Sequence, residues 1–153
     1  MPDQFTWVLK KFEDLSAFEL YKILALRQEV FVVEQNCPYH DCDGKDLRSF
    51  HLTGTDENDF LAAYTRIVFP GVSYDEVSIG RVVSSPKYRR TGSGKLLMQQ
   101  AIKKIEEVYG KVPIRIGAQK YLLEFYKGFG FIPEGETYLE DGIPHVIMLR
   151  TSD

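Results

Sequence analysis

A strand, a glycine-containing loop and a long helix follow one another between residues 77 and 109, and this unit limits the possible folds more than any other feature. The β-branched run VSIGRVV at residues 77–83 predicts a strand. SSPKYRRTGSG then forms a loop, and residues 92–109 show a helical pattern. Backbone amides converge at the start of such a helix, where its dipole favours an anion. The unit therefore predicts a phosphate-binding loop.

The expected helix has one apolar face. Leu97, Ala101, Ile105 and Val108 fall on a single stripe. The residues expected to face water are Lys103, Lys104, Glu106 and Glu107.

Two nucleotide-binding motifs can be tested against the loop. A Walker A loop requires a glycine at position 89 and a hydroxyl residue at position 96, which are Arg89 and Leu96 here. A dinucleotide motif requires a third glycine at the position of Leu97. Both motifs fail, so neither a P-loop nor a Rossmann unit is expected.

The rest of the chain predicts strands with helices inserted between them. The expected strands are residues 7–12, 49–54, 60–69, 114–118, 136–139 and 145–149. Ser16 and Glu19 form a capping box, which predicts a helix running toward Val30. Another helix begins near residue 121 and breaks at Gly128. This arrangement indicates an α/β fold with a mixed sheet.

Length and composition limit the function classes. The 153 residues fit one domain, residues 1–153. A formal net charge of -3 argues against nucleic acid as a partner. No apolar run approaches the ~20 residues of a membrane span, and the first residues do not resemble a signal peptide. Cys37 and Cys42 lack the spacing of a redox or zinc motif, so we expect free thiols and a cytoplasmic protein.

Several segments together resemble a known family. The loop fits the pattern [Gln/Arg]-x-x-Gly-x-[Gly/Ala] at Arg89, Gly92 and Gly94, and GRVVSSPKYRRTGSGKLLMQQAI resembles the acetyl-CoA loop of the GNAT superfamily of N-acetyltransferases. FYKGFGF at residues 125–131 resembles its tyrosine signature. LRQEVFVVEQNCPYHDCDGKD and EDGIPHVIM resemble the ElaA-like group within that superfamily. These segments cover most of the chain in the family's order.

The resemblance implies a mixed, mostly antiparallel central sheet flanked by helices, with acetyl-CoA at a splayed strand and the glycine loop. It implies that the pantetheine arm pairs with Val82, Val83 and Ser84. The loop residues implied to hold the diphosphate are Arg89, Arg90, Thr91, Gly92, Ser93, Gly94 and Lys95. Gln119 stands where many members carry asparagine, and it is expected to hydrogen-bond the cofactor arm.

The implied reaction is direct transfer of an acetyl group to a primary amine. A backbone amide near Val83 is the candidate to polarise the thioester carbonyl. Tyr126 matches the family's tyrosine and would protonate the leaving thiolate, because a phenol with a pKa near ~10 keeps its proton at neutral pH. The base that takes the ammonium proton stays open among Glu34, His51 and His145.

The segment of residues 34–46 is acidic. Its charged side chains are Glu34, Asp41, Asp43 and Asp46 against Lys45 alone. This rim is expected to attract a cationic amine. DCDGKD resembles the start of a calcium loop, but Leu52 stands at the place of the bidentate glutamate, so no metal site is expected.

The sequence also allows two functions other than an enzyme. One is a non-catalytic acyl-CoA-binding or regulatory module on the same fold, and the other is a nucleotide-binding protein, which the failed motifs disfavour. Tyr126 favours the enzyme. The expected acceptor is an amine-bearing small molecule or peptide, and strands near the C-terminus leave a homodimer open.

Overall fold

The computed structural model describes residues 4–151, and its strands form two antiparallel sheets. The four-stranded sheet has the order β1 (Thr6–Lys11), β2 (Ser49–Thr55), β3 (Leu61–Val68), β4 (Ser78–Ser84). The three-stranded sheet has the order β5 (Ile114–Gln119), β7 (Ile143–Arg150), β6 (Ile132–Glu140). The prediction of a mostly antiparallel α/β fold is confirmed.

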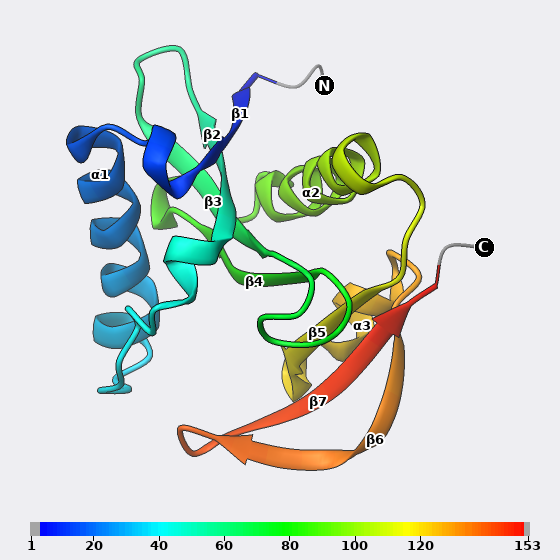
Figure 1. Ribbon diagram of the computed structural model, residues 1–153. Coiled ribbons are helices and arrows are strands. Elements are labelled where there is room, and N and C mark those ends of the chain that lie inside the picture. The colour runs from blue at the N-terminus through cyan, green and yellow to red at the C-terminus, as the bar shows by residue number, and fades with distance from the viewer. Residues whose placement is uncertain (1–3, 152–153) are drawn as a thin grey trace.

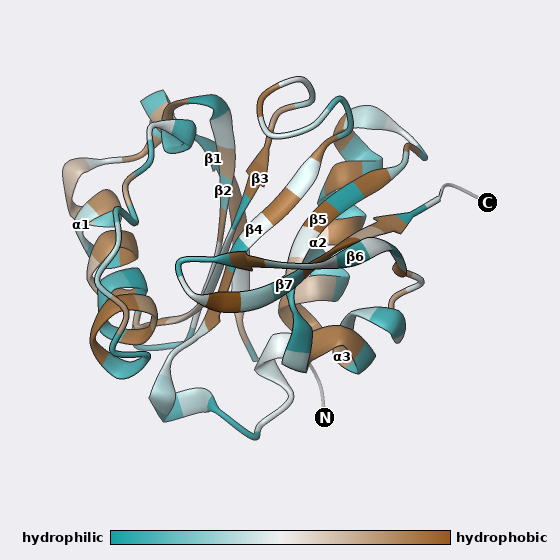
Figure 2. Cartoon of the chain, turned by 90° about the horizontal axis from the view of Figure 1, so that it is seen from below, coloured by the Kyte–Doolittle hydropathy of each residue, from teal (hydrophilic) through white to brown (hydrophobic). Residues whose placement is uncertain are grey.

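Helices cover both faces of the larger sheet. The helix α1 (Ala17–Arg27) lies on one face, and α2 (Ser93–Tyr109) lies on the other side together with α3 (Leu123–Lys127) (Figures 1 and 2). Short 3-10 helices occur at Phe12–Asp14, Lys45–Arg48, Pro86–Tyr88 and Lys120–Leu122. Within residues 4–151, no helix has both the length and the apolar character that crossing a membrane requires.

The capping box predicted for α1 is present in full. The Glu19 amide donates to Ser16 Oγ at 3.0 Å, and the Ser16 amide donates to Glu19 Oε1 at 2.8 Å. The end of this helix was not predicted, because the chain continues as a π-helix, Gln28–Glu34. Widened turns of this kind are rare and are frequent at functional sites.

Separate apolar clusters fill the two sides of the four-stranded sheet. On the α1 side, Ile23 and Leu26 pack with Tyr64 and Val83. On the α2 side, the buried residues of the helix are Leu97, Met98, Ala101, Ile102 and Ile105, together with Ser93.

One residue of the predicted apolar stripe is exposed instead of buried. Val108 is 46% exposed, because it lies in the last turn of α2, where the neighbouring Tyr109 packs against the core instead. The ring of Tyr109 stands edge-on to Phe50 with 6.4 Å between their centroids. The rest of the stripe is buried as predicted.

The C-terminal strands are longer than predicted. Pro133 and Gly135 interrupt the strand pattern, yet both lie within β6. Proline is tolerated there because β6 is an edge strand. Asp141 and Gly142 connect β6 to β7, and both have positive φ, 51° and 77°, as a two-residue hairpin turn with the right-handed strand twist requires.

Candidate functional site

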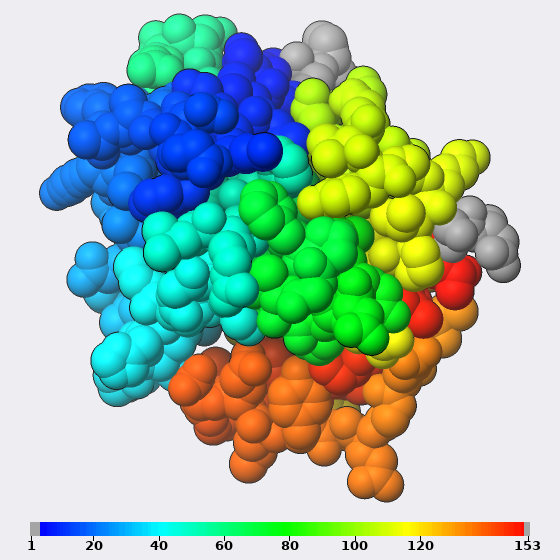
Figure 3. Space-filling model, in the orientation of Figure 1, coloured from blue at the N-terminus to red at the C-terminus, as the bar shows by residue number. Residues whose placement is uncertain are grey.

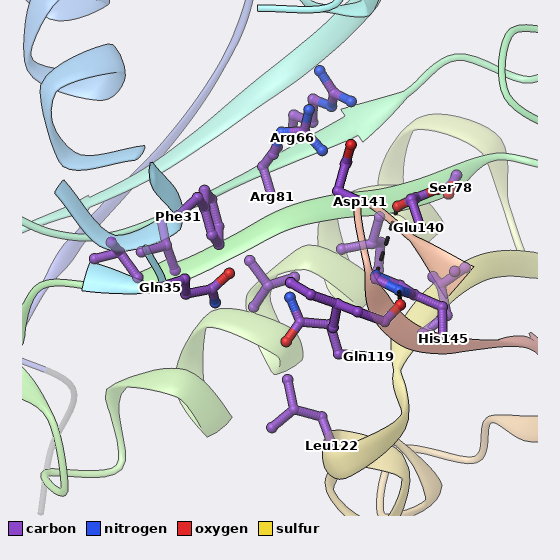
Figure 4. Close-up of a pocket in the computed structure, with 18 of the residues that line it drawn as sticks. Phe31, Gln35, Arg66, Ser78, Arg81, Gln119, Leu122, Glu140, Asp141 and His145 are labelled. Carbon is purple, nitrogen blue, oxygen red and sulfur yellow. Dashed lines mark hydrogen bonds and ion pairs between the residues drawn. The ribbon is translucent and has the colours of Figure 1, made fainter. Parts of the chain in front are cut away.

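A cavity lies where the two sheets separate. The strands β4 and β5 meet at an isolated parallel bridge between Val77 and Ile114. Beyond this bridge they belong to different sheets, and a cavity of about 520 Å³ opens beside them. Phe31 and Gln35 lie on one side of it and His145 on the other (Figure 4). In the space-filling view a hollow remains between the orange β6–β7 hairpin and the cyan segment above it (Figure 3).

The strand β4 carries a bulge at the cavity wall. Tyr64 pairs with Val83 and Arg66 pairs with Gly80, so β4 has one residue more than β3 over this stretch. Arg81, inside the bulge, has a φ of 53°, which is strained for a residue with a side chain. A bulge bends its strand and redirects the following groups. The predicted residues Val82, Val83 and Ser84 follow it directly and line the cavity.

The loop before α2 ends in an open helix N-terminus. Gly92 is the N-cap with a φ of 85°, no side chain caps this end, and a Cβ at Gly92 would meet no atom within 4 Å, among residues 4–151. Ser93 is buried because its hydroxyl donates to the Tyr88 carbonyl at 3.0 Å. Its side chain therefore holds the loop from inside, while the amides at the start of α2 stay available for an anion.

The other residues of the loop surround this N-terminus. Gly94 packs near Phe125 and Ser84, because a Cβ there would come within 3.9 Å of both side chains. The exposed members of the loop are Arg89, Arg90, Thr91, Gly92 and Lys95. Of residues 89–95, Arg89 alone lines the cavity.

Tyr126 is fixed in the cavity wall with its hydroxyl unengaged. It is 7% exposed, and its ring lies edge-on to Phe125 and Phe131, with centroids 5.2 Å and 6.1 Å away. No hydrogen bond to this hydroxyl exists within residues 4–151. Burial raises the pKa of the phenol, so the proton stays on the oxygen well above neutral pH. In the described part of the chain, the phenol is thus a proton donor without a protein partner.

His145 faces the cavity in a defined tautomer. Its Nδ1 is 2.7 Å from the Ile143 carbonyl, and since a carbonyl only accepts, Nδ1 carries the proton. The lone pair of the neutral ring therefore belongs to Nε2, which lies 3.6 Å from the Glu140 carboxylate. Tyr138 lies beside the ring, with 5.8 Å between centroids. This arrangement suits a group that accepts and returns a proton.

The other two candidate bases are engaged elsewhere. The His51 nitrogens lie 2.7 Å from the Tyr64 hydroxyl and 2.9 Å from the Asp46 carbonyl. Its ring is buried, which lowers its pKa, and it does not line the cavity. Glu34 lines the cavity but binds Arg89 through both carboxylate oxygens. This hydrogen bonding to Arg89 lowers the pKa of Glu34 and makes it a weak base.

The expectation of an electrostatically acidic rim is wrong. Arg27 binds Asp46 at 2.8 Å and Asp41 at 2.9 Å, and Arg66 binds Asp43 at 2.7 Å. Arg81 adds a further bond to Asp41 at 2.8 Å. These arginines come from α1, β3 and β4, so the segment of residues 34–46 gave no sign that its carboxylates are neutralised.

Because the arginines of this ion network are buried, each charge in it depends on its oppositely charged partner. Arg27 is fully buried, and Arg66 is 4% exposed. Although burial alone would raise the pKa of Asp46, the hydrogen bond and charge of Arg27 outweigh it and lower that pKa. Arg66 Nε is a buried donor without a partner among the described residues 4–151. In the same part of the chain no group of three His, Cys, Asp or Glu side chains could hold a metal ion.

The cavity also contains residues that sequence reasoning missed. Arg81, Tyr39, Tyr121 and Glu140 line it, and Gln119, which was predicted, lies there too. Gly80 inside a β-branched strand was the available signal for the bulge at Arg81. Glu140 had no such signal, because its place beside His145 depends on the hairpin register.

Comparisons with known proteins agree with this geometry. A family model described as an acetyltransferase (GNAT) domain matches residues 28–152. Protein ElaA of Escherichia coli is 45% identical over 139 residues, which cover 90% of each chain. An acyl-CoA N-acyltransferase structure from Pseudomonas aeruginosa has 42% identity and a TM-score of 0.90, covering 96% of this chain and 99% of that one. The E. coli ElaA structure has a TM-score of 0.88, covering 95% and 99%.

Proposed function

The chain belongs to the GNAT acetyltransferase family and its ElaA-like group, and we propose that it transfers an acetyl group from acetyl-CoA to a primary amine. The proposal places this activity on a single domain, residues 1–153. The observation that carries it is the cavity beside β4. Tyr126 lines this cavity, and so does Arg89 of the loop that leads to the N-terminus of α2, which has no side-chain cap within residues 4–151. An acetyltransferase needs an anion cradle and a proton donor at these two places.

The residues present fit coenzyme A. The strand β4 ends its sheet, so beyond the Val77 bridge its free edge offers Val82, Val83 and Ser84 to an extended amide-containing arm. At the end of that strand the bare amides of residues 92–95 suit a diphosphate, and Arg90 and Lys95 add positive charge nearby. Gln119 on β5 lines the same cavity and would hydrogen-bond the arm.

Bound acetyl-CoA supplies a thioester, whose carbonyl carbon is open to attack by an amine. The bulge in β4 turns the backbone near Val83, and an amide there would polarise the carbonyl oxygen as charge builds on it. Tyr126 holds its proton in a buried site and would donate it to sulfur as the thiolate leaves.

His145 is the base that this geometry favours. Its Nε2 lone pair faces the cavity from the side opposite the π-helix, and it would take the proton that the substrate ammonium must lose before its nitrogen can attack. Glu140, 3.6 Å from Nε2, stabilises the imidazolium that forms. The acceptor is an amine on a small molecule or peptide that reaches the cavity past the β6–β7 turn.

We further propose that the protein works in the cytoplasm. Cys37 and Cys42 are free thiols, as expected of a reducing compartment. The unpaired edge of β6 is the element through which two copies would pair if the protein forms a homodimer.

An amine-panel assay tests the proposed function. Wild-type protein is incubated with acetyl-CoA and individual polyamines, amino acids, aminoglycosides or peptides, and free thiol is followed over time. We expect thiol release above the hydrolysis background with at least one amine class. Binding of acetyl-CoA without amine-dependent thiol release across the whole panel would favour the non-catalytic module instead.

A further inference from the structure

Glu34 and Arg89 form an ion pair across the cavity. Arg89 Nη1 donates to Glu34 Oε2 at 2.7 Å, and Nη2 donates to Oε1, so the guanidinium and the carboxylate meet in a two-point contact. Glu34 is the last residue of the π-helix, and Arg89 lies three positions before the α2 N-cap Gly92. The pair therefore joins the wall built by the π-helix to the loop that presents the anion site.

This pair is exposed enough to exchange partners. The side chains of Arg89 and Glu34 are 40% and 45% exposed, so solvent screens their attraction. A guanidinium has five N–H donors, and a diphosphate offers it more negative charge than a single carboxylate. Arg89 is the one residue of the loop, residues 89–95, that lines the cavity, and it lies three positions before Gly92, where the proposed anion site begins.

We propose that Glu34 is a positioning residue that holds Arg89 until the cofactor diphosphate arrives, and that diphosphate binding draws Arg89 away from it. The inference rests on the proposed function, because it takes coenzyme A as the ligand. Glu34 thereby weakens cofactor binding by competing for Arg89, and release of Arg89 loosens the link between the π-helix and the loop.

Calorimetric titration of coenzyme A into the Glu34→Gln variant tests the competition. Glutamine keeps the size of the side chain but removes the charge that holds Arg89. We expect the Kd for coenzyme A to fall by up to about fivefold, because an exposed ion pair competes only weakly with the diphosphate. The Kd for pantetheine, which lacks the diphosphate, stays unchanged.

Control variants separate this effect from a general change in charge. Glu107→Gln removes the same charge from another exposed ion pair, with Lys104 near the far end of α2, and leaves the Kd for coenzyme A unchanged. Arg89→Gln raises that Kd about tenfold or more, because a charged hydrogen bond is lost. In the Arg89→Gln background, adding Glu34→Gln has no further effect, since Glu34 acts through Arg89.

The outcomes assign failure to one claim or the other. An unchanged or higher Kd for coenzyme A in Glu34→Gln overturns the inference alone. An equal fall in the Kd for pantetheine also overturns the inference. So does an equal fall in the Kd for coenzyme A when Glu34→Gln is added to Arg89→Gln, because Glu34 would then act through its own charge and not through Arg89. If the wild-type protein binds no coenzyme A, the proposed function fails and the inference falls with it.

Discussion

At the scale of single residues, Tyr126 is the side chain whose role is most open to test. In Tyr126→Phe, packing against Phe125 and Phe131 survives while the proton donor is lost. The interaction with sulfur strengthens only as charge develops, so we expect kcat to fall ~10²-fold or more with little change in KM. Steady-state kinetics with an accepted amine measure this.

Tyr109→Phe is the matched control. It removes a phenol hydroxyl from a partly buried tyrosine that packs on the core outside the cavity lining. Its kcat should equal that of the wild type. An unchanged kcat in Tyr126→Phe would reduce Tyr126 to a packing residue.

What the sequence revealed at this scale depended on local pattern. Tyr126 stands in a recognisable run, FYKGFGF, so it was found. The base could not be chosen, because the facts that separate the candidates are long-range. Glu34 is held by Arg89, 55 positions away, and the His51 nitrogens are occupied by Tyr64 and the Asp46 carbonyl.

At the scale of elements, the N-terminus of α2 should accept one anion. Gly92→Asp places a carboxylate where the diphosphate binds, and we expect it to abolish coenzyme A binding in calorimetry while the fold persists. Gly44→Asp is the control, because Gly44 has the same left-handed backbone as Gly92 (φ 85° and ψ -17° against φ 85° and ψ 6°) and equally open space. Retained micromolar affinity in Gly92→Asp, about 8 kcal/mol of binding free energy, would contradict the anion site.

The ion network of residues 41–46 should be essential for stability. Asp46→Asn leaves Arg27 and Arg66 buried without their shared carboxylate. Breaking a buried pair from one side typically costs ~3–5 kcal/mol, and urea unfolding measures the loss. The exposed pair of Lys22 with Asp59 provides the control, since Asp59→Asn should cost less than ~1 kcal/mol.

The stability that Asp46 contributes should depend on pH in a defined way. The folded pKa of Asp46 lies below its unfolded value of about 3.9, because Arg27 and Arg66 outweigh the effect of burial. Its contribution is therefore complete above that unfolded value and is lost as the pH falls through the folded pKa. The wild-type advantage over Asp46→Asn should stay constant from about pH 7 to 5 and shrink below about pH 4. A constant advantage down to about pH 2 would argue against this ionisation.

Helices and strands were easier to predict than the irregular segments and contacts between them. Regular periodicity and the Ser16 capping box located the strands and helices, because both depend on neighbours a few positions apart. The π-helix, the bulge at Arg81 and the neutralised acidic segment were missed. Each of these depends on packing between elements, which the local sequence does not record.

At the scale of the whole molecule, the cavity should select coenzyme A among nucleotide ligands. The loop lacks the Walker hydroxyl and the third Rossmann glycine, while the free edge of β4 suits a pantetheine arm. In thermal-shift measurements we expect coenzyme A to raise the Tm and ATP and NAD to leave it unchanged. Stabilisation by ATP without stabilisation by coenzyme A would contradict the proposed site.

The central claim is direct transfer of the acetyl group from the cofactor to the amine, and mass spectrometry before and after amine addition tests it most directly. Wild-type protein incubated with acetyl-CoA alone should keep its own mass and release no thiol beyond hydrolysis. Adding an accepted amine should yield acetylated amine and free coenzyme A in equal amounts. An acetylated protein that accumulates before the amine is added, or coenzyme A released without acetylated amine, would contradict the account.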